Sequence, residues 1–317
     1  MILITGSTGF VGMNLLKELL KDNNNVVALY RSEVKKKKVE DFLKDIDCNN
    51  IIWRKSDIND IVSLEDAFEG IKKVYHCAGF ISFSISDREK LNKVNIQGTE
   101  NIVNLCIDKK IHKLIHLSSI SALGEQTSGV NITEKTKYYE SKYTSPYSNS
   151  KYNAELEIWR GIEEGVNSVI VSPGIILGKS IKGDSPQSKI EKMITQSPLC
   201  FYTKGKSGFV NISDVVNTSI ALMNSSISNE KFILVAKNLS FKSVICQLKK
   251  RLKIKKEIVS VRKIIFYLIL FFDFILSFLW FKNRYLSLSL IKSLFNKNEY
   301  DGKKITKFLP NFNYEQI

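Results

Sequence analysis

The feature that most constrains the fold is a glycine-rich turn, TGSTGFVG at residues 5–12, which follows a short apolar run at the start of the chain. Its glycines, Gly6, Gly9 and Gly12, are spaced three residues apart and open an amphipathic segment. Such a turn allows a tight bend, lets a diphosphate approach the N–H groups at a helix start, and permits close packing of helix on strand. A simple tight turn is the alternative. Its position between a predicted strand and a predicted helix favours a dinucleotide-binding turn.

Short apolar runs alternate with helical patterns through the first half of the chain. Near-continuous apolar strands separated by helices are typical of a parallel sheet that is covered on both faces. We therefore expect the α/β class, with a Rossmann-type doubly wound parallel sheet and a ligand site at the carboxyl ends of its strands. The predicted strands are 2–4, 26–30, 51–54, 74–77, 114–117 and 168–171, and the predicted helices are 10–22, 64–68, 88–108 and 148–164.

The alternation loosens after residue 172, where loops rich in Gly, Ser and Lys appear. We expect residues 1–172 to form the dinucleotide-binding core and 173–317 to form a smaller, mostly helical substrate-binding region. Within this region, 209–236 is expected to return to the core, with a helix after Asp214 and a strand at 232–236.

The net charge of +15 raises the question of nucleic-acid binding. Most of the excess is lysine without an aromatic-interleaved basic motif, so we expect a solvated surface and no nucleic-acid partner. The five cysteines are scattered without a C-x-x-C pair, which favours reduced thiols over a disulfide framework or a zinc site. No secretory signal is recognised, and the expected compartment is the cytoplasm.

Further motifs follow the glycine-rich turn in a fixed order over residues 1–240. With them the chain resembles the extended or atypical short-chain dehydrogenase/reductase family. Within that family it is most similar to the dihydroflavonol reductase/3β-hydroxysteroid dehydrogenase-like and NAD-dependent epimerase/dehydratase branch. The motifs are SDI at 56–58, VYHCAG at 74–79, VNIQGTEN at 94–101, HLSS at 116–119, Y-x-x-x-K at 147–151 and SPG at 172–174.

The resemblance implies a nicotinamide dinucleotide cofactor and assigns its contacts. Asp57 would accept from the adenine amino group and Ile58 would pack on the ring. Ala78 and Gly79 would let the cofactor pass close to the backbone, and residues 173–176 would wall the nicotinamide. The complete expected set is Gly6, Thr8, Gly9, Phe10, Val11, Gly12, Arg31, Asp57, Ile58, Ala78, Gly79, Tyr147, Lys151, Pro173, Ile175 and Ile176.

The choice between NAD and NADP is read at the end of the second predicted strand. A carboxylate there would bind the ribose hydroxyls of NAD, whereas an arginine can hold a 2′-phosphate. The sequence has Arg31-Ser32 at this point and no acid before Glu33. Arg31 could instead stack on the adenine and leave both cofactors usable. We favour NADP, because the guanidinium is a fork donor suited to phosphate.

Tyr147 and Lys151 lie one helical turn apart in a segment that begins with Ser-Pro and continues into helix formers. A nearby ammonium favours phenolate and lowers the pKa of a tyrosine, so the pair can serve acid–base chemistry on a carbonyl. Ser119 is expected at the end of the fifth strand, where it would hold the substrate oxygen; Ser118 is its rival, and the family pattern selects Ser119. The resemblance adds Asn95, which would fix a helix bend and a water of the proton relay.

Several reactions share this core. The family's dehydratases have Thr-Asp-Glu at the end of strand five, where this chain has Ser119-Ile120-Ser121. Its nucleotide-sugar epimerases tend to have an Asn and an Arg where this chain has Gly174 and Ser207, with Lys206 as a weaker substitute. We therefore favour an oxidoreductase, with reduction as the favoured direction, acting on a small and fairly apolar substrate. The alternatives are a nucleotide-sugar epimerase and a non-catalytic dinucleotide-binding regulator.

Two further features need an interpretation. The three histidines are isolated from carboxylates at ligand spacing, so we expect core or helix-end roles and no metal site. Residues 264–281 form an apolar segment with a single charge, Asp273, and follow a basic run that starts at Lys249. Burial over the substrate pocket or in a homodimer interface, peripheral membrane contact through 249–281, and a true membrane span are the alternatives for this segment.

Overall fold

The computed structural model describes residues 1–126, 129–141, 144–181, 183, 185–280 and 287–317, without the side chains of 272 and 274–280. The predicted apolar segment therefore extends beyond the described residues at position 281. The body of the molecule is a seven-stranded sheet with neighbouring strands all parallel, in the order β10-β6-β5-β4-β1-β2-β3. This confirms the predicted Rossmann-type fold. The strands are β1 (Ile2–Thr5), β2 (Val26–Tyr30), β3 (Ile51–Lys55), β4 (Lys73–His76), β5 (Lys113–Leu117), β6 (Ser168–Pro173) and β10 (Glu230–Leu234).

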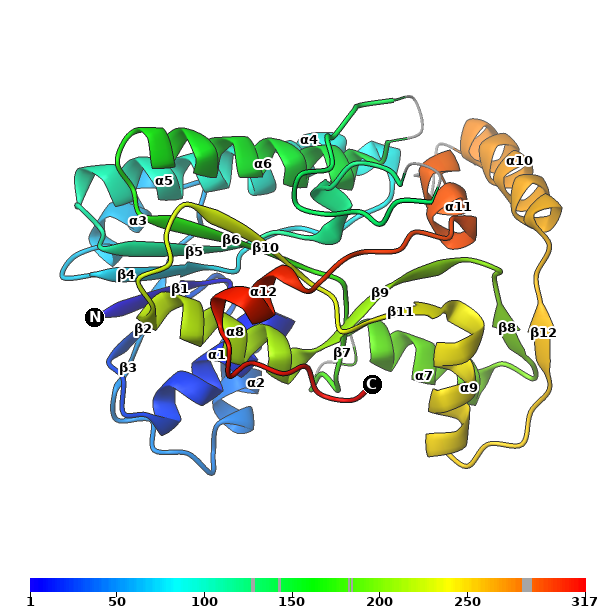
Figure 1. Cartoon of the computed structure of the whole chain (residues 1–317), viewed down its shortest axis with the longest axis horizontal. Helices are drawn as coiled ribbons and strands as arrows, with labels where there is room; N and C mark the ends of the chain where they lie inside the picture. Colours follow the sequence, from blue (N-terminus) through cyan, green and yellow to red (C-terminus); the bar gives the residue numbers. More distant parts are fainter. Residues whose placement is uncertain (127–128, 142–143, 182, 184, 281–286) are drawn as a thin grey trace.

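Alternate side chains of the central strands enter two separate cores, because successive residues of a strand point to opposite faces. Ile2 and Ile4 belong to the core beneath α1 (Phe10–Lys21) and α8 (Ile212–Asn224), whereas Leu3 belongs to the core on the other face. Helices α3 (Ile61–Ala67), α5 (Gly98–Asp108) and α6 (Pro146–Glu163) cover that second face. Figure 1 shows α5 and α6 above the sheet and α1 and α8 below it.

The helix expected over 88–108 is interrupted. It consists of α4 (Arg88–Leu91), a π-helical turn η2 (Asn92–Gln97) and α5. A short 3₁₀ turn, η1 (Ile85–Asp87), precedes α4. The widened turn places Asn95 in the middle of the helical run, at the position where the sequence analysis expected a bend.

Helix α6 starts two residues earlier than predicted. Ser145 is its N-cap, and its hydroxyl accepts a hydrogen bond from the backbone N–H of Ser148 at 2.9 Å. Pro146 takes the first helical position, where its missing N–H costs nothing. This start sets the direction of Tyr147 and Lys151, which are both buried.

The smaller region contains two small sheets that were not anticipated. In the first, β7 (Ile175–Leu177), β9 (Lys206–Asn211) and β11 (Lys237–Ser240) lie in the order β11-β9-β7. In the second, β8 (Cys200–Tyr202) pairs with β12 (Ile258–Ser260). Helices α7 (Pro186–Gln196) and α9 (Phe241–Arg251) pack here around a separate apolar cluster. Between these parts, α8 and β10 return to the main sheet and extend it by one strand.

In the described part of the chain, the last helices are α10 (Lys263–Trp280), α11 (Leu288–Phe295) and α12 (Lys304–Phe308). Helix α12 packs on the main core through Ile305, which is fully buried. Helix α10 lies at the outer corner of the smaller region, beside α11 (Figure 1). Among the residues that the structure describes, no helix combines the length and hydropathy that a bilayer crossing requires.

Candidate active site

The glycine-rich turn is packed so tightly that side chains are excluded at two of its glycines. Gly6 has φ of 67°, and a Cβ there would lie 2.6 Å from the backbone nitrogen of Ala78. A Cβ on Gly12 would lie 2.2 Å from the carbonyl oxygen of Gly6. The turn thus brings α1 against β1 and the segment after β4, and leaves bare backbone at the carboxyl edge of the sheet. This cradle fits the diphosphate of a dinucleotide.

The other predicted residues of the turn form the start of α1. The Gly9 N–H donates to the Gly6 carbonyl at 2.8 Å, and Gly9 is the N-cap of the helix. The outer side of this helix start is accessible to solvent, because Gly9 is exposed and Thr8, Phe10 and Val11 are half-buried. The N–H groups at this helix start are therefore accessible to an anion, which the helix dipole favours.

A directed chain of hydrogen bonds runs beneath the turn. The Ala78 N–H donates to the Thr5 hydroxyl oxygen at 3.1 Å, and that hydroxyl lies 2.7 Å from His76 Nδ1. On the other side, His76 Nε2 lies 3.0 Å from the Thr99 hydroxyl, which donates to the Asn95 carbonyl at 2.6 Å. His76 must therefore carry its proton on Nε2. Burial lowers the pKa of His76 to about 3, so the ring is neutral and joins β1, β4 and α5.

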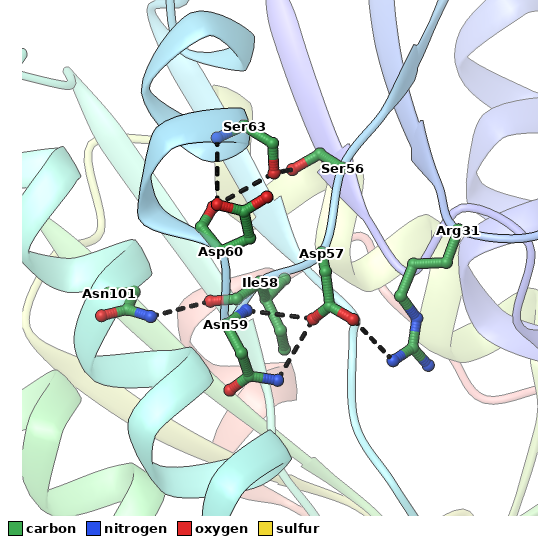
Figure 2. Close-up of polar contacts among 8 residues, drawn as sticks. All are labelled: Arg31, Ser56, Asp57, Ile58, Asn59, Asp60, Ser63 and Asn101. Carbon is green, nitrogen blue, oxygen red and sulfur yellow. Dashed lines mark hydrogen bonds and ion pairs between the residues drawn. The ribbon is translucent and has the colours of Figure 1, made fainter.

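At the end of β2, Arg31 forms an ion pair with Asp57, with Nη1 3.2 Å from Oδ2 (Figure 2). Asn59 donates to the other oxygen of Asp57 from its backbone nitrogen at 3.0 Å and from its side-chain amide at 3.1 Å. Burial tends to raise the pKa of Asp57, but the hydrogen bonds from Asn59 and Arg31 outweigh it and leave the pKa below its ordinary value. The two residues predicted for the adenosine end thus lie side by side, and both side chains are partly exposed.

The motif at 94–101 positions Ile58. A Cβ on Gly98 would lie 2.5 Å from Ile58 Cδ1, so a side chain at this position would have to shift Ile58. Asn101 donates to the Ile58 carbonyl at 2.9 Å (Figure 2). The segment predicted to pack on the adenine is therefore held by two residues of α5.

Ser119, Tyr147 and Lys151 meet at the carboxyl end of β5. The Ser119 oxygen accepts from the Ser121 N–H at 3.1 Å as it caps a short 3₁₀ turn. Burial raises the pKa of Tyr147 to about 12, and a hydrogen bond with the Ser119 hydroxyl opposes the rise. Lys151 donates to the Leu117 carbonyl at 2.8 Å, and burial lowers its pKa to about 8. In this structure Lys151 donates to the backbone and burial dominates, so the pKa of Tyr147 lies above its ordinary value. The lowering expected from Lys151 together with a bound nicotinamide stays a prediction.

Asn95 fastens the segment after β4 to α6. Its Oδ1 accepts from the Phe80 N–H at 2.7 Å, and its Nδ2 donates to the Phe80 carbonyl at 3.0 Å and to the Ser150 hydroxyl at 2.8 Å. Ser150 in turn donates to the Tyr147 carbonyl at 2.9 Å. Both amide hydrogens of Asn95 thus have protein partners. Its predicted water-holding role stays a prediction. Gly79 lies close by, since a Cβ there would be 3.4 Å from Asn95 Oδ1.

The predicted nicotinamide wall follows β6. Pro173 is buried as the last residue of β6, and Ile175 and Ile176 are half-buried in β7. Between them, Gly174 is pressed against β9, because a Cβ there would lie 2.5 Å from the Gly208 carbonyl oxygen. This apolar wall faces the same edge of the sheet as Ser119.

Sequence reasoning missed Glu155, which is 2% exposed on α6, one turn beyond Lys151. One carboxylate oxygen accepts from Ser118 at 2.5 Å and from Ser172 at 3.3 Å, and the other lies 2.5 Å from Lys231 Nζ. Ser118 and Ser172 immediately precede Ser119 and Pro173. A single buried carboxylate thus ties α6 to the carboxyl ends of β5 and β6, and to β10. The sequence signal for this role was a glutamate four residues after Lys151, on the same face of the predicted helix.

The apolar segment after β4 was also missed. The Phe83 ring packs edge-on against Tyr147 with 5.9 Å between centroids. Ile81, Phe83 and Ile85 are all exposed, at 67, 37 and 49%. The alternation of apolar and serine residues in FISFSI was the signal that could have identified this wall.

His116 remains a core residue without an assigned partner. It is fully buried, and neither ring nitrogen has a hydrogen-bond partner among the described residues. Burial holds its pKa well below the ordinary value, and its ring lies 5.2 Å from that of His76. Over the described ranges, no cluster of His, Cys, Asp and Glu side chains could hold a metal ion.

Comparison with known proteins agrees with this geometry. The model of the NAD dependent epimerase/dehydratase family matches residues 2–234. The chain belongs to this family. A putative dihydroflavonol 4-reductase of Synechocystis sp. is 26% identical over 249 residues, covering 77% of this chain and 70% of the relative. A UDP-glucose 4-epimerase of Vibrio cholerae is 28% identical over 245 residues, covering 74% and 70%.

The solved structures extend the likeness to the whole chain. The UDP-glucuronic acid 4-epimerase from Bacillus cereus, solved with UDP-glucuronic acid and NAD, has a TM-score of 0.77 at 19% identity, covering 99% of this chain and 94% of that one. At this identity the likeness concerns the fold. Family membership and the named relatives make the protein an NAD(P)-dependent enzyme of the oxidoreductase type.

Proposed function

We propose that the protein is an NADP-dependent reductase of a small, apolar ketone or aldehyde, with Tyr147 as the proton donor. The observation that carries the proposal is the position of the buried Tyr147 beside Ser119 at the carboxyl end of β5. With a pKa of about 12, Tyr147 is protonated at neutral pH and can donate to an oxygen that becomes an alkoxide. Ser119 would hold the same oxygen, and Lys151 would turn from the Leu117 carbonyl toward the cofactor ribose.

The bound cofactor would supply the hydride, and this chain's residues hold and orient it. The bare backbone of the turn suits the diphosphate, Asp57 and Ile58 suit the adenine, and Pro173 with the β7 isoleucines suits the nicotinamide. A fixed approach of the carbonyl between this wall and Tyr147 is what hydride transfer requires.

An apolar substrate is supported by the segment after β4. The exposed side chains of Ile81, Phe83 and Ile85 lie on the segment that reaches the Tyr147 ring, and no charged side chain of this segment precedes Asp87. Burial of apolar surface against such a wall favours an apolar ligand. We also propose the cytoplasm as the setting, because its reducing conditions suit the five free cysteines.

A nucleotide-sugar substrate is less well supported. The position at which the family's epimerases tend to carry an Asn is Gly174, where the Gly208 carbonyl leaves no room for a side chain. Lys206, the remaining candidate for gripping a diphosphate, is ion-paired with Glu299. A nucleotide sugar would therefore have to displace this ion pair in order to gain a cationic partner.

The test is NADPH oxidation with a panel of carbonyl compounds, followed at neutral pH. We expect turnover with apolar ketones or aldehydes and none with UDP-glucose as sole substrate. Interconversion of UDP-hexose epimers in the presence of oxidised cofactor, NAD or NADP, without a net change in its redox state would instead identify an epimerase. Tight NADPH binding without any turnover across the panel would identify a non-catalytic regulator.

The preference for NADP is tested at Arg31. In Arg31→Ala, Kd for NADPH is expected to rise by about 10–100-fold, because a charge-assisted hydrogen bond to phosphate contributes about 1.5–3 kcal/mol. Kd for NADH should change little. Arg54→Ala on the adjacent strand β3 removes a nearby positive charge without touching the predicted phosphate position, and serves as the control. Equal losses for NADPH and NADH would show that Arg31 contacts the adenosine and not a 2′-phosphate.

A further inference from the structure

Helix α10 carries a row of apolar side chains that are exposed to solvent. Ile264, Leu268 and Phe271 share one face of the helix and are 58, 52 and 58% exposed. Soluble proteins rarely expose contiguous apolar side chains of this size unless the surface binds something. The exposed apolar side chains of the helix are Ile264, Ile265, Tyr267, Leu268, Ile269 and Phe271.

The side of α10 that faces the protein is a narrow stripe. Phe266, Leu270 and Asp273 follow each other at four and three residues, and all three are half-buried. The Phe266 ring packs edge-on against Phe295 of α11 with 5.6 Å between centroids. Asp273, the single charge of residues 264–281, therefore belongs to the covered side. Because Asp273 lies on this side, the exposed apolar face of the helix does not carry its charge.

Positive charge borders this apolar face. Arg262 and Lys263 are exposed at the start of α10, and Lys263 Nζ lies 5.7 Å from the centre of the Tyr267 ring. Long cationic side chains can lie along apolar surface while their charges reach anionic groups. One lysine of the preceding basic run, Lys256, does not border this face, because it donates to three carbonyls at the end of α7. The net charge of +15 adds a general attraction to anionic surfaces.

We propose that the exposed face of α10 docks on an anionic lipid bilayer and lies in the plane of the interface. An apolar helix face bordered by cations is the arrangement that such interfaces bind. The exposed Arg262 and Lys263 favour an anionic occupant over a second copy of the chain, which would bring the same cations to the contact. The helix projects at a corner of the molecule (Figure 1), where a flat bilayer can reach it.

The test is co-sedimentation of the full-length protein with vesicles. The wild type is expected to sediment with vesicles of phosphatidylglycerol and phosphatidylcholine, and to stay in the supernatant with phosphatidylcholine alone. Binding should weaken when the NaCl concentration is raised, because salt screens surface charges. In Ile264→Glu/Leu268→Glu, the partition coefficient onto anionic vesicles should fall by about tenfold or more. Val62→Glu/Val130→Glu, which adds the same charge at two other exposed apolar positions, should bind like the wild type.

Three outcomes would overturn the proposal. The first is that the wild type remains in the supernatant with anionic vesicles. The second is that the α10 variant binds the vesicles as well as the wild type does. The third outcome is a wild-type dimer in light scattering that becomes a monomer in the α10 variant, which would assign the face to a second copy. Binding of NADPH reports folding of each variant. These readouts do not depend on turnover, so a failure here would leave the proposed reaction standing.

Discussion

Replacement of Tyr147 by phenylalanine is expected to lower kcat/KM for carbonyl reduction by about 10²–10⁴-fold, which corresponds to roughly 3–5 kcal/mol of transition-state stabilisation. The variant keeps the ring that packs against Phe83 and loses only the hydroxyl that meets Ser119. Because most of the cofactor is proposed to be held by the glycine-rich turn, Asp57 and Ile58, loss of this one hydroxyl should leave Kd for NADPH within a few-fold of the wild-type value. Steady-state NADPH oxidation and a separate binding titration measure the two quantities.

Tyr152→Phe provides the matched control. Tyr152 lies on the same helix, five residues further along, and its ring stacks on Tyr138 with 4.1 Å between centroids. Loss of its hydroxyl should leave kcat/KM close to the wild-type value. If Tyr147→Phe retained full turnover, another group would have to donate the proton, and the proposed role of Tyr147 would be wrong.

Glu155→Gln is expected to lower the free energy of unfolding by about 3–5 kcal/mol, because it leaves the buried ammonium of Lys231 without its counter-charge. The side chains of the pair are 3 and 10% exposed, so water cannot replace the lost partner. Against a total stability of about 5–15 kcal/mol, this is a large fraction. Urea unfolding followed by circular dichroism measures the change. We also expect kcat to fall, because Glu155 holds the strand ends next to Ser119 and Pro173.

Two further variants separate this effect from a general loss of charge on α6. Glu157→Gln breaks an ion pair with Arg160 that is more exposed, and should cost at most about 1 kcal/mol. In Glu155→Gln/Lys231→Met the unpaired charge is removed as well, so stability should recover in part. A cost under about 1 kcal/mol for Glu155→Gln alone would show that the ion pair does not stabilise the fold.

The strands of the core could be predicted because their signal is local. Runs such as 26–30 are apolar throughout, and the structure buries them on both faces of a parallel sheet. Helix α2 (Glu33–Phe42) gave no such signal, since Val39 is its single buried residue and four lysines lie in its middle. The short strands β7, β9 and β11 depend on pairing between residues far apart in the chain, which local patterns do not encode.

The candidate site, like the fold, could be predicted from the sequence only in part. The order of motifs was enough to bring Ser119, Tyr147 and Lys151 together at the end of β5, because helix spacing and strand ends follow from sequence. The environment of these groups was not predictable. The pKa of Tyr147 depends on how deeply α6 buries it, and the partners of Glu155 come from β6, β10 and the residue after β5. The ion pair of Arg31 and Asp57 joins residues 26 positions apart.

The hydrogen-bond chain through Thr5 and His76 restricts what position 5 can be. The Thr5 hydroxyl oxygen accepts a hydrogen bond from the Ala78 N–H and the hydroxyl donates one to His76 Nδ1, so one group must both accept and donate. Valine has the same shape, but it would leave the Ala78 N–H and the buried His76 Nδ1 without a hydrogen-bond partner. The larger side chain of asparagine would not fit the space of a hydroxyl. Threonine and serine are the side chains that meet both demands. The residue that opens the glycine-rich turn is thus selected by a histidine 71 positions away in the sequence, and not by the cofactor that the turn is proposed to hold.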